Sequence, residues 1–170
     1  GEDVTLNAKL VANIPTRLKI PVSCHVRGEV VMPLQVFNEK YSEVSPNPRN
    51  LCSGALRQKH GDGKADASDL VFCAYDVKFV SDSPSVQYDS ELLHFLKHSI
   101  GIEPAPWQVF DSGSLHTEMI EHTKHWSMQR STYTFEIDGL VFKLDDLEQR
   151  ERLGSTAHHP RWALAWKFPP

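Results

Sequence analysis

Hydrophobic and polar residues alternate in two segments of the chain, and this two-residue period predicts two β-strands. In SCHVRGEVVM, residues 23–32, the polar His25, Arg27 and Glu29 fall on one face and apolar side chains on the other. The segment LVFCAYDVKFV, residues 70–80, is the stronger prediction of the two. The residues expected to share one face of that strand are Val71, Cys73, Tyr75, Val77 and Phe79.

Spacing of three and four residues between apolar positions predicts helices over residues 33–44, 89–101 and 114–130. Pro33 suits the first turn of the first helix. Residues 45–50, SPNPRN, are expected to be irregular, because each proline restricts its own backbone and that of the residue before it.

The helix predicted over residues 89–101 carries signals at both of its ends. Asp89 is expected to cap its N-terminus, and Gly101 is a stop signal. Leu92, Leu96 and Ile100 recur at helical spacing, so we expect this helix to pack on a sheet.

The segment FEIDGLVFK, residues 135–143, is hydrophobic enough for a buried strand, yet it carries Glu136, Asp138 and Lys143. An unpaired buried charge costs several kcal/mol, so the strand should turn one face to water or line a site for a charged ligand. A bulge at Gly139 would bring Asp138 and Lys143 to the same side.

After this strand we expect a turn or short helix over residues 145–154 and a last strand over residues 161–168. In the last strand Lys167 shares a row with Ala163 and Ala165, which are small enough to leave room for a ligand. Strands with helices outside them predict an α+β fold with antiparallel sheets, and 170 residues suit a single domain spanning 1–170.

Composition is that of an ordinary globular protein, with 40% hydrophobic and 24% charged residues and a net charge of −4. No apolar run approaches the roughly 20 residues needed to span a bilayer, so no membrane contact is expected. The three cysteines, Cys24, Cys52 and Cys73, are odd in number and have no C-x-x-C spacing. We therefore expect a reducing, intracellular setting and cysteines that act as small buried hydrophobic residues.

Two local clusters of polar residues suggest chemistry. Between residues 49 and 64 the charges are Arg49, Arg57, Lys59 and Lys64 against Asp62 alone, a net of +3 that would make a loop suited to phosphates. The histidines of the helix predicted over residues 114–130 could bind a metal. No carboxylate-rich ligand set accompanies them, so we interpret them as exposed or partly buried polar residues. These histidines are His116, His122 and His125.

Ionisable groups from three separate strands suggest a site for a phosphate anhydride or nucleotide, in which lysines neutralise oxygens and carboxylates hold ribose or Mg²⁺. A plainer interpretation stays open. Lys143 and Lys167 could be strand-end lysines that reach water, and Glu29 could pair with Arg27 on a solvent-exposed face of the first strand.

Five motifs, in this order, closely resemble the adenylation domain of NAD-dependent DNA ligases. They are RGEVVM at 27–32, NPRNLCSGALRQ at 47–58, FCAYDV at 72–77, FEIDGLVFK at 135–143 and LGSTAHHPRWALAWKFP at 153–169. The resemblance covers nearly the whole chain and implies the nucleotidyltransferase fold of antiparallel sheets around an adenylate pocket.

The resemblance also implies roles for single residues. Glu29 would hold the adenylate ribose, Tyr75 would stack near adenine, and Asp138 would act through Mg²⁺ held by water. Lys143 and Lys167 would neutralise the α-phosphate and its leaving group. The positions implied to contact phosphates of DNA or of NAD are Arg49, Arg57 and Arg130.

The family attacks NAD with a lysine in a K-x-D-G motif, and no K-x-D-G occurs in these 170 residues. We therefore expect a fragment that begins after the nucleophile and does not adenylate itself. The expected parent is a monomeric, cytoplasmic, bacterial-type ligase associated with the nucleoid that seals nicked double-stranded DNA. A non-catalytic nucleotide- or DNA-binding module is the alternative, whereas N-P-R-N and P-R-W-A argue against an ATP-using RNA ligase or capping-type enzyme.

Overall fold

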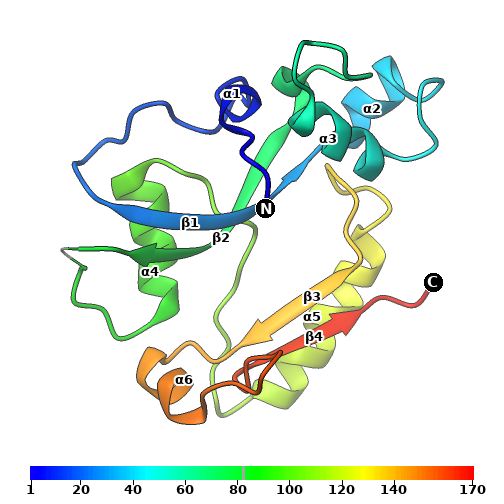
Figure 1. The fold of residues 1–170 in the computed structure, drawn as a ribbon. Coiled ribbons are helices and arrows are strands. Elements are labelled where there is room, and N and C mark those ends of the chain that lie inside the picture. The colour runs from blue at the N-terminus through cyan, green and yellow to red at the C-terminus, as the bar shows by residue number, and fades with distance from the viewer. Residues whose placement is uncertain (82) are drawn as a thin grey trace. The chain divides into compact units, whose positions relative to one another are not determined.

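The computed structural model describes residues 1–81 and 83–170 and has the expected α+β architecture with antiparallel sheets (Figure 1). The chain divides into two compact units. The first unit comprises Gly1–Ser83 and Leu93–Ala105, and the second comprises Pro84–Leu92 and Pro106–Pro170. Each unit is described below by itself, and the single domain expected over 1–170 stays a prediction.

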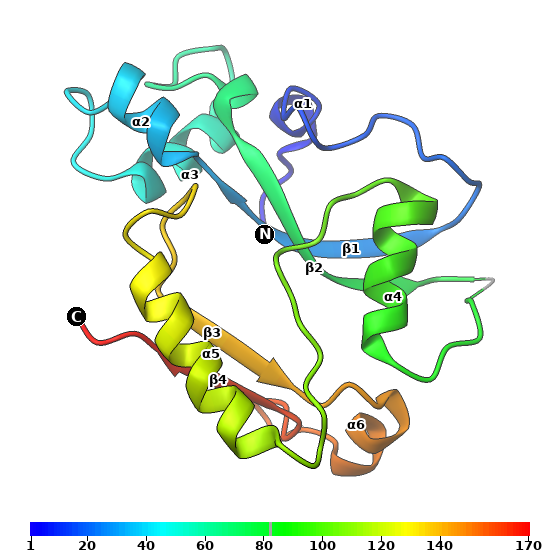
Figure 2. The ribbon, with the colours of Figure 1, turned by 180° about the vertical axis from the view of Figure 1, so that it is seen from behind.

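The first unit is built around a two-stranded sheet with short helices (Figure 2). Its elements are α1 (Thr5–Ala8), β1 (Cys24–Val31), α2 (Leu34–Lys40), α3 (Pro48–Arg57), the 3₁₀ helix η1 (Ala67–Asp69) and β2 (Val71–Phe79), followed by the end of α4 (Asp89–Phe95) and the π-helical turn η2 (Leu96–Ile100). The strands predicted over 23–32 and 70–80 are therefore confirmed.

A bulge interrupts the antiparallel ladder of β1 and β2. Arg27 pairs with Asp76 and Gly28 with Ala74, so Tyr75 is the extra residue on β2. An extra residue changes which face the following side chains occupy. The prediction that all five alternating apolar residues of β2 share a face is therefore wrong.

The bulge divides those residues between the two faces of the sheet. Cys73 is the cross-strand partner of Glu29, whereas Val77 pairs with Val26 on the other face. Gly28 is required at this point, since a Cβ atom there would overlap the Cys73 carbonyl and the Phe72 ring. The bulge and the glycine together allow the two backbones to approach closely.

The main core of the first unit lies among α2, α3 and the ends of the two strands. Its buried residues are Val11, Met32, Phe37, Leu51, Cys52, Ala55, Ala65, Ala67 and Leu70. Only one of the three cysteines is fully buried: Cys52 belongs to this core, whereas Cys24 and Cys73 are half-buried. The expectation of three buried cysteines is therefore correct for Cys52 alone.

The segment predicted to be irregular over residues 45–50 begins a helix instead. The Asn47 side chain accepts a hydrogen bond from the Asn50 amide at 3.0 Å, and Pro48 is the first residue of α3. Proline is tolerated there because the amide that it lacks has no partner inside the helix. By contrast, α2 is shorter than predicted, and Pro33 precedes its first residue instead of joining its first turn.

The helix predicted over residues 89–101 ends as expected and begins differently. Gly101 adopts a left-handed conformation with φ of 92°, and Leu96 and Ile100 are fully buried. Asp89, however, is the first helical residue and is buried, so it does not occupy the capping position before the helix.

The second unit contains an antiparallel pair of strands with a long helix along it (Figures 1 and 2). Besides the start of α4, its elements are α5 (Leu115–Gln129), β3 (Gly139–Lys143), α6 (Leu147–Leu153) and β4 (Ala163–Lys167). Each was predicted in type, but β3 begins only at Gly139. Glu136 and Asp138 precede it, and both are exposed in an alternating stretch, which places these carboxylates in water.

One face of the β3–β4 pair is covered by aromatic residues. Phe110 lies 6.2 Å from Phe142, and Trp126 of α5 lies 5.1 Å from Tyr133, measured between ring centroids. At the other end of the unit, Arg150 forms a buried ion pair with Asp89 at 3.1 Å. Among the described residues, no helix is long and apolar enough to cross a membrane.

Candidate functional site

Lys143 and Lys167 project from the same face of the β3–β4 pair. Lys143 pairs with Ala163, and Gly139 pairs with Lys167, without a break in the ladder between them. Cross-strand partners share a face, and so do residues two apart on one strand. Both lysines are exposed, and this face is opposite to the one that Phe142 turns toward Phe110.

The two lysines stand at opposite ends of this open face. They are four residue steps apart along the ladder, which corresponds to roughly 13 Å at the usual strand rise. Val141 and Ala165 pair between them and leave the middle of the face shallow. Long flexible lysine side chains can direct both ammonium groups toward that middle.

Asp138 lies beside Lys167 at one end of the face. Its Oδ2 atom is 3.0 Å from the Lys167 Nζ atom, and its carbonyl oxygen accepts a hydrogen bond from the Phe168 amide at 2.9 Å. The side chains are 77% and 68% exposed, respectively. Such an exposed pair contributes little to stability and remains open to exchange with a ligand.

The expected bulge at Gly139 is absent from the ladder, which is regular from Gly139 to Lys143. Glycine is needed there for a different reason: a Cβ atom would overlap the Trp166 carbonyl oxygen. Asp138 therefore reaches Lys167 because the backbones approach closely at the start of β3. The predicted bulge at Gly139, which would have turned Asp138 and Lys143 to the same side, is wrong.

Arg130 supports the chain just beyond Lys167. It ends α5, donates a hydrogen bond from Nη1 to the Pro169 carbonyl at 2.9 Å, and its guanidinium lies 5.0 Å from the Phe168 ring centre. These contacts fix the end of β4, and the phosphate contact implied for Arg130 stays a prediction.

Glu29 and Tyr75 lie close together on the sheet of the first unit. Glu29 is exposed and pairs with Cys73, and Tyr75, the bulged residue, is 46% exposed two positions further along β2. Burial raises the pKa of the Cys52 thiol to about 11, and the Glu29 carboxylate adds to this rise. Burial and Glu29 also raise the pKa of Cys73. The carboxylate thus stands beside two protonated, weakly reactive thiols.

Arg49 and Arg57 lie on a helix and not on the expected loop. Together with Ser53 they are spaced by four residues on the exposed side of α3, opposite Leu51 and Ala55 of the core. Arg57 contacts Glu2 at 3.9 Å. A helix presents these two cations in a fixed row, which the loop would not do.

The donor set fits a weakly held Mg²⁺ and not a dedicated metal cage. Among the described residues, no group of three or more His, Cys, Asp or Glu side chains could hold an ion. Mg²⁺ often binds through one carboxylate, water and substrate phosphates. The exposed Asp138 carboxylate can serve as that single protein anchor.

Comparison with known proteins decides the family. The model of a family described as NAD-dependent DNA ligase adenylation domain matches residues 1–170. The chain belongs to this family. The DNA ligases of Bacillus cytotoxicus and Halothermothrix orenii are 37% and 38% identical over 99% of the chain, and that of Leptospira interrogans is 36% identical over 99%. The matches cover 26%, 25% and 24% of those relatives, so the chain spans about a quarter of their length.

Two residues that hold loops of this adenylation domain in place were not identified from the sequence patterns. Gln58 hydrogen bonds to the carbonyls of Ala55 and Ala65 and accepts from the Gly63 amide, which closes the glycine-rich loop against α3. Arg150 donates from Nε to the Leu144 carbonyl, directly after Lys143. Gln58 lies in a recognised motif, but nothing in the sequence around Arg150 distinguishes it from the exposed arginines.

Proposed function

We propose that this adenylation domain supplies the phosphate-neutralising and adenylate-binding residues of an NAD-dependent DNA ligase that seals nicks in double-stranded DNA. The observation that carries the proposal is the open β3–β4 face, on which Lys143 and Lys167 share one side and Asp138 lies beside Lys167. Family membership supports the reaction class.

The proposed role of the two lysines is charge stabilisation. NAD supplies the AMP group and the nicotinamide mononucleotide leaving group. Lys143 and Lys167 neutralise the non-bridging oxygens of the α-phosphate, where negative charge develops during transfer. Lys167 can leave Asp138 for phosphate at small cost because the pair is exposed. Asp138 then becomes available to hold Mg²⁺ through water.

The proposed role of Glu29 and Tyr75 is to bind the nucleoside. The Glu29 carboxylate can accept hydrogen bonds from ribose hydroxyls, and the half-exposed Tyr75 ring can pack on adenine. Binding of the nucleoside orients the α-phosphate for in-line attack, which lowers the entropic part of the barrier.

Arg49, Arg57 and Arg130 are proposed to contact phosphates of nicked DNA or of the nicotinamide half of NAD. Such contacts make binding fall steeply with salt concentration. We further propose that the parent protein acts as a monomer in the bacterial cytoplasm, on the nucleoid. The relatives named above are all bacterial DNA ligases.

The test uses the whole protein that carries this chain, because the lysine that accepts AMP is not among these residues. Lys143→Ala and Lys167→Ala should each slow single-turnover AMP transfer about 10²- to 10³-fold, the usual loss when one preorganised charge partner is removed. Lys124→Ala, an exposed position on α5, is the matched control and should keep the unaltered rate.

Near-normal transfer by either variant, with Lys124→Ala also normal, would refute the proposed site. If the unaltered protein binds NAD or nicked DNA but forms no protein-AMP, a non-catalytic binding module becomes the better description. A dependence on Mg²⁺ that persists unchanged in Asp138→Asn would remove Asp138 as the metal anchor.

A further inference from the structure

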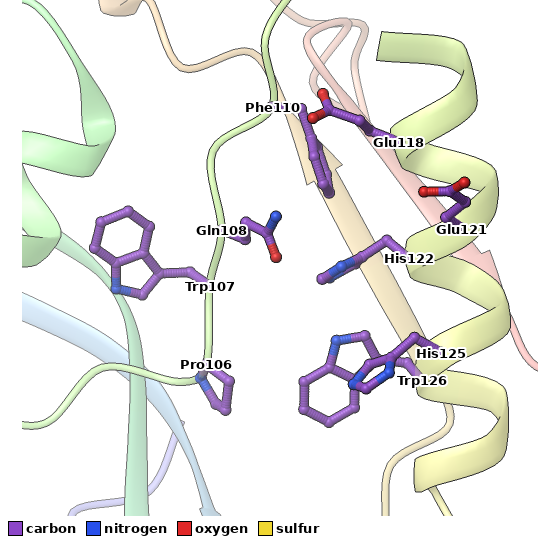
Figure 3. A pocket seen from close by; sticks show the side chains of 9 residues that line it. All are labelled: Pro106, Trp107, Gln108, Phe110, Glu118, Glu121, His122, His125 and Trp126. Atoms are coloured by element: carbon purple, nitrogen blue, oxygen red, sulfur yellow. The ribbon is translucent and has the colours of Figure 1, made fainter. Parts of the chain in front are cut away.

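The second unit contains a cavity that the proposed ligase chemistry does not use. It has a volume of about 440 Å³ and lies between residues 106–110 and α5 (Figure 3). Phe110, which lines it, packs on the face of the β3–β4 pair opposite to the lysines. Its size falls within the range of small-molecule and side-chain sites.

Three rings form a continuous wall of this cavity. The His122 ring centre lies 5.1 Å from that of Phe110 and 6.3 Å from that of Trp126, and both contacts are edge to face. Figure 3 shows these rings opposite the Gln108 side chain, which points toward α5. A wall of this kind offers aromatic faces and one polar group to an entering ligand.

The charge of the lining is negative. The nine described residues around the cavity include Glu118 and Glu121 but no lysine or arginine. Burial, and then the neighbouring His125, lower the pKa of His122, so its imidazole is neutral at pH 7 and does not offset the carboxylates. Glu118 is held in place because its Oε2 atom accepts a hydrogen bond from the Asp111 amide at 3.2 Å.

We propose that this cavity binds a guanidinium group, presented as an arginine side chain. Aromatic faces attract cations, and a planar guanidinium can stack on a ring while it donates to a carboxylate in two-pronged fashion. Glu121 is exposed beside the ring wall and is the carboxylate available for that contact. The same carboxylates disfavour phosphate-bearing ligands through like-charge repulsion.

The cavity and the lysine face give the second unit two faces that prefer ligands of opposite charge. The lysine face of β3–β4 suits anionic phosphate, whereas the cavity on the other side suits a cation. A partner segment that carries arginine could therefore bind without competing for the nucleotide. This inference does not depend on the proposed ligase reaction.

Fluorine NMR of the full protein labelled with 5-fluorotryptophan can test the site. Trp107 and Trp126 both line the cavity, and Trp126 is the reporter because it belongs to the ring wall. Trp162 and Trp166 lie elsewhere in the unit and serve as internal references. Titration with an acetylated Gly-Arg-Gly amide should shift the Trp126 signal saturably and leave the Trp162 and Trp166 signals in place. Free arginine amide, run in parallel, identifies whether the side chain alone suffices or a peptide is required.

Two cavity variants, one control variant and two further probes make the result decisive. Glu121→Gln and Trp126→Leu should each weaken peptide binding about two- to fivefold, as expected for a partly exposed charge or cation–π contact. Binding to Trp126→Leu is measured by calorimetry, because this variant lacks the reporter tryptophan. Glu148→Gln, an exposed carboxylate on α6, should have no effect. Equal binding of the neutral citrulline peptide, stronger binding of AMP, or no saturable shift at millimolar peptide would each overturn the proposal.

Discussion

Two ion pairs in the second unit have almost the same length and opposite surroundings. Asp89 and Arg150 are 3.1 Å apart with side chains 11% and 10% exposed, whereas Asp138 and Lys167 are 3.0 Å apart and 77% and 68% exposed. In the buried pair each charge depends on the other, because neither can be hydrated. In the exposed pair, water can replace either partner, so the same distance represents a much smaller contribution to stability.

The difference assigns the two pairs to different tasks. Arg150 also donates to the Leu144 carbonyl and lies 4.3 Å above the Trp162 ring, so the buried pair joins α4, α6 and the residues that flank Lys143 and Ala163. The side chains of the exposed pair are in contact with water, and neither is buried by the strands that it joins. It is therefore suited to exchange one partner for a ligand, which the buried pair cannot do.

The largest expected effect comes from breaking the buried pair. Arg150→Met should lower the free energy of unfolding by about 3–5 kcal/mol, because it leaves the Asp89 carboxylate buried without a partner. Urea unfolding measures this loss. Arg152→Met, whose arginine contacts Glu148 at 3.6 Å on the exposed side of the same helix, should change stability by less than about 0.5 kcal/mol.

A double variant separates charge from packing. Asp89→Leu combined with Arg150→Met should recover part of the loss, since two apolar side chains can replace a buried ion pair. Recovery should be incomplete because the Leu144 carbonyl loses its donor. A loss below about 1 kcal/mol for Arg150→Met alone would contradict the contrast between the two pairs.

The second largest effect is expected at Gly139, where the close approach of β3 and β4 positions Asp138 beside Lys167. Gly139→Ala should destabilise the protein by about 1–3 kcal/mol, because its Cβ atom would overlap the Trp166 carbonyl and force the strands apart. Gly54→Ala is the matched control. Gly54 lies inside α3 with no heavy atom near the position of the added methyl, so the substitution should stabilise by about 0.5–1 kcal/mol. Thermal and urea unfolding of the two variants should therefore shift in opposite directions.

Local periodicity was enough to predict most strands and helices, and the motifs were enough to predict the family. The shared face of Lys143 and Lys167 follows from the register of β3 against β4, which local periodicity does not define. The bulge at Tyr75 was not predictable, because alternation alone cannot count an extra residue that only the partner strand defines. The start of α3 could have been predicted: Asn47 followed by Pro48 is a cap and first-turn pair. The buried role of Arg150 depends on residues far away in the sequence, namely Asp89 and Trp162, and no local signal indicates it.

A smaller effect is expected when the exposed pair is broken. Asp138→Asn should change the free energy of unfolding by no more than about 1 kcal/mol, since the Lys167 ammonium remains hydrated. Asp89→Asn, the same chemical change in the buried pair, should cost several times more. Measured side by side, similar losses for the two asparagine variants would show that exposure does not distinguish these pairs.

The smallest expected effect comes from His122, which is neither as buried as Arg150 nor as exposed as Lys167. Burial, with a contribution from His125, lowers the pKa of His122 from its ordinary value of 6.5, so the unfolded state binds a proton first as pH falls. The contribution of neutral His122 to stability is therefore fully present above the unfolded-state pKa of 6.5. It is lost as the pH falls from there through the lowered pKa of the folded state. Urea unfolding at pH 7.5 and 5.5 should show a smaller pH-dependent loss in His122→Asn than in the unaltered protein. Parallel losses in the two proteins would mean that protonation of His122 costs the folded state nothing.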